Sequence, residues 1–217
     1  GQRCSALRVL FIQEDIAPRV LDLLKGAMAE LHIGDPSRRD VDLGPVIDDD
    51  ALRGLREHVE RLKADNRLIA ETPMPAGLDG HFIAPAAFRL DHINQLDREH
   101  FGPLLHVITW KHQELDKVID DINATGFGLT LGIHSRNDRT ARYIDSRVRI
   151  GNVYVNRNQI GAVVGVQPFG GQGLSGTGPK AGGPHYLLRF VTERTRTINT
   201  TAVGGNASLL ALGDDDA

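Results

Sequence analysis

The sequence of 217 residues contains a single cysteine, Cys4, and lacks several other features that would assign a class at once. One cysteine excludes an internal disulfide, which fits a reducing compartment. The first residues are polar, so no secretory signal peptide is indicated. No apolar run approaches the roughly 20 residues that a membrane-spanning helix needs. The formal net charge is −3 with charges scattered along the chain, so no basic stripe indicates a nucleic-acid binder.

Two kinds of ligand motif are also missing. None of the nine histidines lies in an H-E-x-x-H pattern or near a cysteine partner, so the sequence predicts no metal site. GQGLSG (171–176) formally matches the dinucleotide fingerprint, but that fingerprint needs a strand before it and a helix after it. Here PF precedes the glycines and TGPKAGGP follows, and Pro179 stands where a phosphate-binding loop would have its lysine. We interpret the segment as a glycine-rich structural loop.

Apolar patterning predicts strands and helices in alternation. The expected strands are 5–13, 67–71, 81–88 (an edge strand, because it contains Pro85), 104–110, 129–135 and 152–156. The expected helices are 14–31, 51–64 (capped by Asp48–Asp50), 114–125 and 138–148. This order predicts an α/β fold with a mainly parallel twisted sheet and flanking helices.

The last quarter of the chain has a different pattern. Residues 161–184 are too rich in Gly and Pro for regular structure, and they predict a long loop of the kind that is usually functional. Residues 185–190 can form at least one helical turn. Residues 191–202 alternate apolar and polar side chains, which predicts an exposed strand.

Two residues stand out chemically before any family is considered. A lone cysteine is usually a small buried hydrophobe, but Arg3 and Ser5 are poor neighbours for an apolar pocket, and a turn with free N–H groups can stabilise a thiolate or an oxyanion. Glu99 follows no clear pattern: it is either a solvated charge or a carboxylate that accepts bonds from a sugar diol. The residues alone leave both alternatives open.

Four motifs in order give a more specific signal. They are GQRCSA (1–6), EHFGP (99–103), INATGFGLTLGIHSRN (122–137), and GNVYVN (151–156) followed by QPFGG (167–171). Together they resemble the aldehyde dehydrogenase superfamily, in which they form the nucleophile loop, the E-x-F-G-P motif, the N-x-x-x-x-G-L segment, and the substrate-side strand and loop. Phe127 stands where the family often has a tyrosine, a departure that affects no catalytic residue.

The residues of two further segments resemble one particular branch of this superfamily. Residues 157–190 and TAVGGNASLL (201–210) are similar to the pyrroline-5-carboxylate dehydrogenase half of the bifunctional proline utilization A family. The resemblance implies NAD as cofactor, glutamate γ-semialdehyde as substrate, a homo-oligomeric cytoplasmic enzyme, and FAD only in a separate proline dehydrogenase domain. Peripheral membrane association of the parent protein is left open.

The resemblance also implies roles for individual residues. Cys4 is the nucleophile, and its backbone N–H helps to hold the oxyanion. Glu99 binds the ribose hydroxyls of the nicotinamide side, with Phe101 packed nearby. Phe169 lines the aliphatic part of the substrate. The donors expected to hold the substrate α-carboxylate are Ser5 and the backbone N–H groups of Gly161 and Ala162.

The domain organisation follows from the same resemblance. We expect residues 1–190 to form the catalytic domain and residues 191–217 an oligomerisation strand with a tail. The family's cofactor-binding domain, glutamate base and oxyanion-hole asparagine lie upstream of the cysteine. We therefore expect a cut piece of a longer polypeptide that is inactive alone.

Three alternatives remain from the sequence. The first is a dehydrogenase for another aldehyde or semialdehyde. The second is a non-catalytic oligomerisation module with a dehydrogenase-like fold, which an inert Cys4 thiol would favour. The third is a cysteine hydrolase, for which the sequence names no histidine base.

Overall fold

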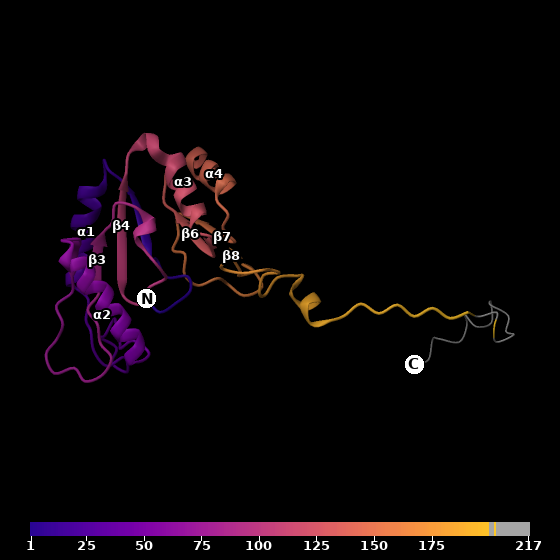
Figure 1. Cartoon of the computed structure of the whole chain (residues 1–217), viewed down its shortest axis with the longest axis horizontal. Coiled ribbons are helices and arrows are strands. Elements are labelled where there is room, and N and C mark those ends of the chain that lie inside the picture. Colours follow the sequence, from indigo (N-terminus) through magenta and orange to yellow (C-terminus); the bar gives the residue numbers. More distant parts are fainter. Residues whose placement is uncertain (200–201, 203–217) are drawn as a thin grey trace. The chain divides into compact units, whose positions relative to one another are not determined.

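The computed structural model describes residues 1–199 and 202, and the chain divides into two compact units, Gly1–Gly183 and Pro184–Ala217. The first unit contains a four-stranded sheet with the order β1-β4-β3-β2 (Figure 1). Its strands are β1 (Val9–Gln13), β2 (Leu68–Glu71), β3 (Ala86–Arg89) and β4 (Leu104–Trp110). Strand β4 is parallel to β1 and to β3, whereas β2 is antiparallel to β3. The prediction of a mainly parallel sheet in an α/β fold is confirmed.

Two helices, α1 (Ala17–Ala29) and α2 (Asp49–Ala64), pack against the sheet. The side chains of β4 alternate between the two faces of the sheet, so each face presents apolar residues for a helix to cover. Leu104 and Ile108 belong to a buried cluster with Leu55 of α2. Val107 belongs to a second cluster with Leu21 of α1. Each helix therefore buries its apolar stripe against one face, and β4, an inner strand of the sheet, contributes side chains to both clusters.

The start of α2 follows the capping rule that the sequence suggests. The side chain of Asp48 accepts a hydrogen bond from the Ala51 backbone N–H at 2.8 Å, which satisfies one of the free donors of the first turn. Asp49 and Asp50 add negative charge at the positive end of the helix dipole. The predicted helix is confirmed, two residues longer at its start than expected.

A second group of elements follows β4 in the same unit. Strands β6 (Thr130–Ile133) and β7 (Asn152–Val155) pair in parallel, and the short strands β5 (Phe127–Gly128) and β8 (Gln172–Gly173) pair antiparallel. The helices here are α3 (Leu115–Ala124) and α4 (Asp138–Arg147), which Figure 1 shows beside β6 and β7. The strands therefore form separate small sheets where the sequence suggested one.

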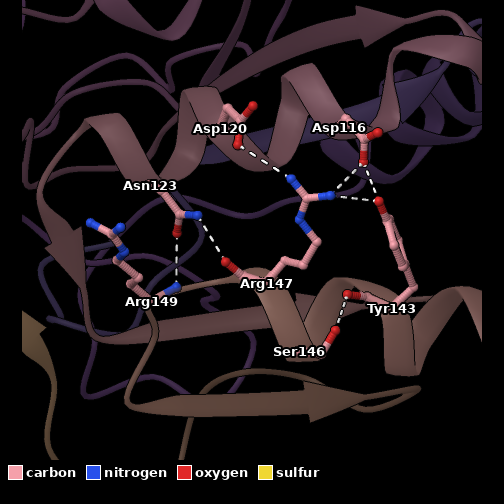
Figure 2. Close-up of polar contacts among 7 residues, drawn as sticks. All are labelled: Asp116, Asp120, Asn123, Tyr143, Ser146, Arg147 and Arg149. Carbon is pink, nitrogen blue, oxygen red and sulfur yellow. Dashed lines mark hydrogen bonds and ion pairs between the residues drawn. The ribbon is translucent and has the colours of Figure 1, made fainter.

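Polar contacts join α3 to α4 and to the segment after α4 (Figure 2). Arg147 forms ion pairs with Asp116 at 3.2 Å and with Asp120 at 3.8 Å. The side chain of Asn123 donates to the Arg147 carbonyl at 2.9 Å and accepts from the Arg149 N–H at 2.8 Å. The asparagine of the N-x-x-x-x-G-L segment thus fixes the chain where it turns from α4 into β7.

Two expectations about irregular segments need correction. Pro85 lies just before β3, which is an interior strand and not an edge strand. A proline has no N–H for the ladder, so the strand begins at Ala86, one residue after it. The loop 161–184 does contain some pairing, since β8 lies within it and Phe169 pairs with Ala181.

The second unit is described as far as residue 199, with residue 202. Near its start lies the 3₁₀ helix η3 (Tyr186–Phe190), in agreement with the expected helical turn. Two further 3₁₀ helices, η1 (Ile93–Gln95) and η2 (His112–Glu114), belong to the first unit. The expected strand over 191–202 is not formed within 191–199. A strand exists only through pairing with a neighbour, so an oligomerisation strand stays a prediction. The GGNASLL ending lies outside the described residues.

Two further observations concern the described residues as a whole. None of their helices combines the length and the apolar character that crossing a bilayer requires. Within the same residues, no group of three or more His, Cys, Asp or Glu side chains is arranged to hold a metal ion.

Candidate active site

Cys4 lies in a tight turn that precedes β1. The turn is closed by a hydrogen bond from the Ala6 N–H to the Arg3 carbonyl at 3.1 Å. Cys4 is exposed and its thiol is free, whereas the next residue, Ser5, is only 7% exposed. The thiol is therefore accessible on a turn that is fixed on its interior side.

The nucleophile turn and the E-x-F-G-P segment approach each other closely at two glycines. A Cβ atom on Gly1 would overlap the carbonyl oxygen of Gly102, and a Cβ on Gly102 would lie 2.5 and 2.7 Å from the methyl groups of Leu55. Gly1 would meet backbone atoms, so this position requires glycine for close packing. At Gly102 the buried Leu55 side chain would have to shift to make room. Gly1 therefore serves close approach, where the sequence suggested only a tight turn.

Arg8 connects these two segments through its side chain. Its Nη1 donates to the Gly1 carbonyl and its Nη2 to the Arg3 carbonyl, each at 2.8 Å. Its Nε lies 3.8 Å from Oε1 of Glu99, and its guanidinium carbon lies 4.4 Å from the ring centroid of Phe101. The structure thus brings Cys4, Glu99 and Phe101 together around one arginine.

The charge of Arg8 is partly removed from water. Burial lowers the pKa of Arg8 from its ordinary value, and attraction to Glu99 and to Cys4 opposes that effect. An arginine remains charged under these conditions. A positive charge is therefore held between the two residues to which the resemblance assigns the nucleophile and the ribose contact.

Three buried histidines lie beneath this site. His58 of α2 stacks on His100 with ring centroids 3.5 Å apart, and its Nε2 lies 2.8 Å from Nε2 of His106 on β4. His100 is the variable residue of the E-x-F-G-P motif, and Nδ1 of His106 bonds to the Arg8 carbonyl at 3.0 Å. The cluster therefore joins both candidate segments to α2 and to the sheet from the interior side.

The substrate-side loop meets the nucleophile turn at one contact. The side chain of Gln159 donates to the Ser5 carbonyl at 3.3 Å. Gly161 has a φ of +79°, and no heavy atom lies within 4 Å of the position that a Cβ would take there. The backbone at Gly161 thus has the left-handed conformation and the free space that the carboxylate hypothesis requires, with Ala162 next to it.

Phe169 is held by a different set of contacts. Its backbone N–H and carbonyl both pair with Ala181 at 2.9 Å. The side chain of Asn152 accepts from the Gly170 N–H at 3.1 Å and donates to the Pro168 carbonyl at 3.0 Å. The QPFGG segment is therefore fixed against β7 and the loop that follows. The glycine-rich segment 171–176 that follows contains β8 and turns and does not open a helix, in agreement with its interpretation as a structural loop.

The sequence interpretation missed Arg8 and the histidine cluster. Arg8 interrupts the apolar run 5–13, and a charge inside a predicted buried strand implies a polar partner. His106 similarly stands within the apolar run 104–110. These two interruptions were the available signals, but the partners lie far away in the sequence.

The aldehyde dehydrogenase family model matches residues 1–196. The chain belongs to this family. The match includes all of the candidate site residues and the whole of the first unit.

Individual relatives agree with this assignment. The bifunctional protein PutA of Klebsiella aerogenes is 48% identical over 200 residues, which is 89% of this chain and 15% of that protein. A solved structure of a mutant of proline utilization A from Bradyrhizobium japonicum superposes with a TM-score of 0.87 at 56% identity, covering 93% of this chain and 20% of the other. A 1-pyrroline-5-carboxylate dehydrogenase from Thermus, solved with bound NAD, gives a TM-score of 0.79 at 35% identity over 88% of this chain and 36% of the other. This chain therefore spans only a minor part of each relative's length.

Proposed function

We propose that the chain is the nucleophile-bearing part of an NAD-dependent 1-pyrroline-5-carboxylate dehydrogenase, which oxidises glutamate γ-semialdehyde to glutamate in proline catabolism. The observation that carries the proposal is the arrangement around Arg8, which holds the exposed Cys4 turn against Glu99 and Phe101. The similarity to PutA and to 1-pyrroline-5-carboxylate dehydrogenases supports this substrate over other aldehydes.

The residues present fit the nicotinamide side of NAD. The Glu99 side chain is 35% exposed, and its ion pair with Arg8 is long at 3.8 Å, so its oxygens keep free lone pairs for ribose hydroxyls. Phe101, 39% exposed, offers an apolar ring beside it. When bound, NAD supplies the hydride acceptor. In this chain, Glu99 would orient the ribose and Phe101 would exclude water from its neighbourhood.

The reaction on Cys4 follows from thiol chemistry. The thiolate sulfur forms a bond to the aldehyde carbon, and the carbonyl π electrons move to the oxygen, which the Cys4 backbone N–H stabilises. With the hydride acceptor that bound NAD would supply, that carbon would become the carbonyl carbon of a thioester on Cys4. Water then attacks the thioester carbon and the C–S bond breaks, which releases the carboxylate product, regenerates the Cys4 thiolate and gives up two protons.

The substrate side is assigned on the same basis. A substrate α-carboxylate needs several convergent donors, and the N–H groups of Gly161 and Ala162 at a turn with positive φ can form an anion-binding nest. Ser5 adds a hydroxyl next to the nucleophile. Phe169 would pack on the aliphatic carbons between the aldehyde and the carboxylate.

The proposal extends to the organisation of the parent protein. Residues 1–190 would form the catalytic domain, working with a cofactor-binding domain of the same polypeptide, and residues 191–217 would take part in a homo-oligomer. The division of the chain at Gly183 and Pro184 supports a boundary close to this position. We place the parent in the cytoplasm, with FAD confined to a separate proline dehydrogenase domain.

The decisive experiment uses the longer polypeptide that contains this chain together with its cofactor-binding domain. Glutamate γ-semialdehyde and NAD should give NADH, and Cys4→Ser should abolish NADH formation while NAD still binds. Preference for propanal over the semialdehyde would instead indicate another aldehyde dehydrogenase. A wild-type protein that forms no NADH with either aldehyde would favour the non-catalytic module.

A further inference from the structure

The oxygen that Arg8 contacts in the nucleophile turn belongs to a specific peptide group. The carbonyl of Arg3 and the N–H of Cys4 are the two polar ends of one planar amide. This carbonyl accepts two hydrogen bonds, from the Ala6 N–H at 3.1 Å and from Nη2 of Arg8 at 2.8 Å. With two donors on the oxygen, the plane of the amide is fixed, and so is the direction of the Cys4 N–H.

We propose that Arg8 is a positioning residue that orients and polarises the Cys4 backbone N–H, and so prepares it to hold the oxyanion formed when Cys4 attacks a carbonyl group. A charged donor on a carbonyl oxygen draws electron density through the amide and makes the N–H at its other end a better donor. The inference rests on the proposed function for the identity of the nucleophile.

The rest of Arg8 is held firmly enough for this role. Its carbonyl accepts from both the backbone N–H and the Nδ1–H of His106, each at 3.0 Å. The side chain of Arg8 is 15% exposed, and its Nη1 donates a hydrogen bond to the Gly1 carbonyl. The backbone of Arg8 is thus fixed to β4 while its side chain spans the turn, so the amide is held against a rigid sheet.

The opposite side of the guanidinium faces the cofactor-side residues. Its Nε is buried and has no hydrogen-bond partner among the described residues, and the Glu99 carboxylate lies 3.8 Å away. The Phe101 ring covers one face of the guanidinium. The same cation that orients the Cys4 N–H is therefore confined by Glu99 and Phe101, which sets the distance between the nucleophile turn and the E-x-F-G-P segment.

The test compares two reactions of Cys4, the one thiol in the 217-residue chain. Acylation by p-nitrophenyl acetate forms an S–C bond through a tetrahedral oxyanion and releases p-nitrophenolate, whereas alkylation by iodoacetamide displaces iodide without an oxyanion. The ratio of the two rates reports oxyanion stabilisation and corrects for thiol accessibility and nucleophilicity. Neither reaction uses NAD or an aldehyde, so a failure of the proposed substrate would leave this result interpretable.

We expect Arg8→Met to lower the acylation-to-alkylation ratio by at least about tenfold, since removing an oxyanion donor outright costs about 10²- to 10³-fold. Arg8→Lys keeps the charge but cannot bond both carbonyls in a fork, so its ratio should fall at least about fivefold. The matched control is Arg67→Met. This variant removes an arginine that lies away from the nucleophile turn and pairs with Asp91 at 2.7 Å. Its ratio should equal that of the wild type.

Several results would overturn the proposal. They are an unchanged ratio in Arg8→Met, full rescue by Arg8→Lys, or a wild-type Cys4 that is alkylated but not acylated. Should Arg8→Met not fold, as judged by circular dichroism, the ratio of Arg8→Lys decides the question. In the parent enzyme, kcat should fall about tenfold or more in Arg8→Met and about fivefold or more in Arg8→Lys, with semialdehyde KM changed less than about threefold, because an N–H that acts on the oxyanion stabilises the transition state alone.

Discussion

Nε2 of His58 lies 2.8 Å from Nε2 of His106, and this contact fixes the protonation of both rings. Nδ1 of His106 bonds to a carbonyl oxygen, which can only accept, so this nitrogen carries the proton. Nε2 of His106 is then an acceptor in the neutral ring, and Nε2 of His58 must donate to it. Nδ1 of His58 accepts in turn from Nη2 of Arg61 at 2.9 Å. Hydrogen bonds therefore run in one direction from Arg61 to Arg8, and every ring nitrogen of the pair is used.

The neutral state of the cluster has clear physical causes. Burial lowers the pKa of His58 to about 3 and that of His106 to about 4. At His106 the hydrogen bond to the Arg8 carbonyl opposes this effect, and the charge of Arg61 adds to it at both rings. Burial also lowers the pKa of His100, against the opposing hydrogen bond to Asp97. A second proton on either bonded ring would leave two N–H groups facing each other.

The first prediction concerns stability in acid. A histidine whose folded pKa lies below its unfolded value of about 6.5 favours the unfolded state as the pH falls from that value toward the folded pKa. The free energy of unfolding should therefore decrease between pH 6.5 and pH 4, by up to about 1.4 kcal/mol per pH unit for each such histidine. Urea unfolding monitored by circular dichroism at several pH values measures this slope.

Variants assign the slope to the cluster. His58→Leu should reduce the slope and, at pH 7, cost about 1–3 kcal/mol because Nε2 of His106 loses its donor. His112→Leu, at an exposed position, is the matched control and should leave the slope unchanged. Equal slopes in all three proteins would show that other groups govern acid unfolding.

The second prediction concerns Asn123 in the α3–α4 region (Figure 2). Asn123→Asp keeps an acceptor for the Arg149 N–H but places a carboxylate oxygen against the Arg147 carbonyl. We expect a loss of about 1–3 kcal/mol in unfolding free energy at neutral pH, measured by urea denaturation. The exposed Asn94→Asp should change stability by less than about 0.5 kcal/mol. Equal losses in both variants would mean that the two Asn123 bonds contribute nothing specific.

Local patterns in the sequence were sufficient for most elements. The apolar run 104–110 lies between Pro103 and Lys111, and β4 spans the same residues, Leu104–Trp110. The helix after Asp48 and the helix 114–125 were found from capping and apolar spacing, because these signals depend on neighbouring residues. The family motifs likewise identified the residues that the structure gathers around Arg8.

The remainder depends on contacts that local patterns do not contain. His58 and His106 are 48 residues apart in sequence, and Arg8 and His106 are 98 apart. The strand order β1-β4-β3-β2 likewise brings the first strand beside one almost a hundred residues later. Such pairings are set by the packing of the whole unit, and no window of the sequence reports them. The predicted strand after residue 190 shows the converse, since its alternating pattern finds no partner strand among the described residues.

The third prediction tests Glu99 as a cofactor contact in the parent enzyme. Glu99→Gln keeps the shape of the side chain but removes the charge, and charge-assisted bonds contribute about 1.5–3 kcal/mol each. The KM for NAD should rise about tenfold or more while the KM for the semialdehyde changes little. Glu60→Gln, on the exposed side of α2, is the control and should leave both constants unchanged. An unaltered KM for NAD together with an unaltered kcat would show that Glu99 serves only as the counter-charge of Arg8.

The last prediction separates a carboxylate contact from a simple turn at Gly161. Gly161 and Gly165 share a φ of +79°, and neither has a heavy atom within 4 Å of the position of an added Cβ. Alanine at either position therefore suffers the same backbone strain, of order 1 kcal/mol or more, and the same absence of steric conflict within the protein. The two variants should lose equal stability.

Only Gly161→Ala would place a methyl group over the N–H groups proposed to hold the substrate carboxylate. In the parent enzyme it should lower kcat/KM for the semialdehyde at least about tenfold, which is about 1.4 kcal/mol, and affect propanal much less. Gly165→Ala should treat the two aldehydes alike. If Gly161→Ala also lowers both activities equally, the loop supports the active site in general and the carboxylate is held elsewhere.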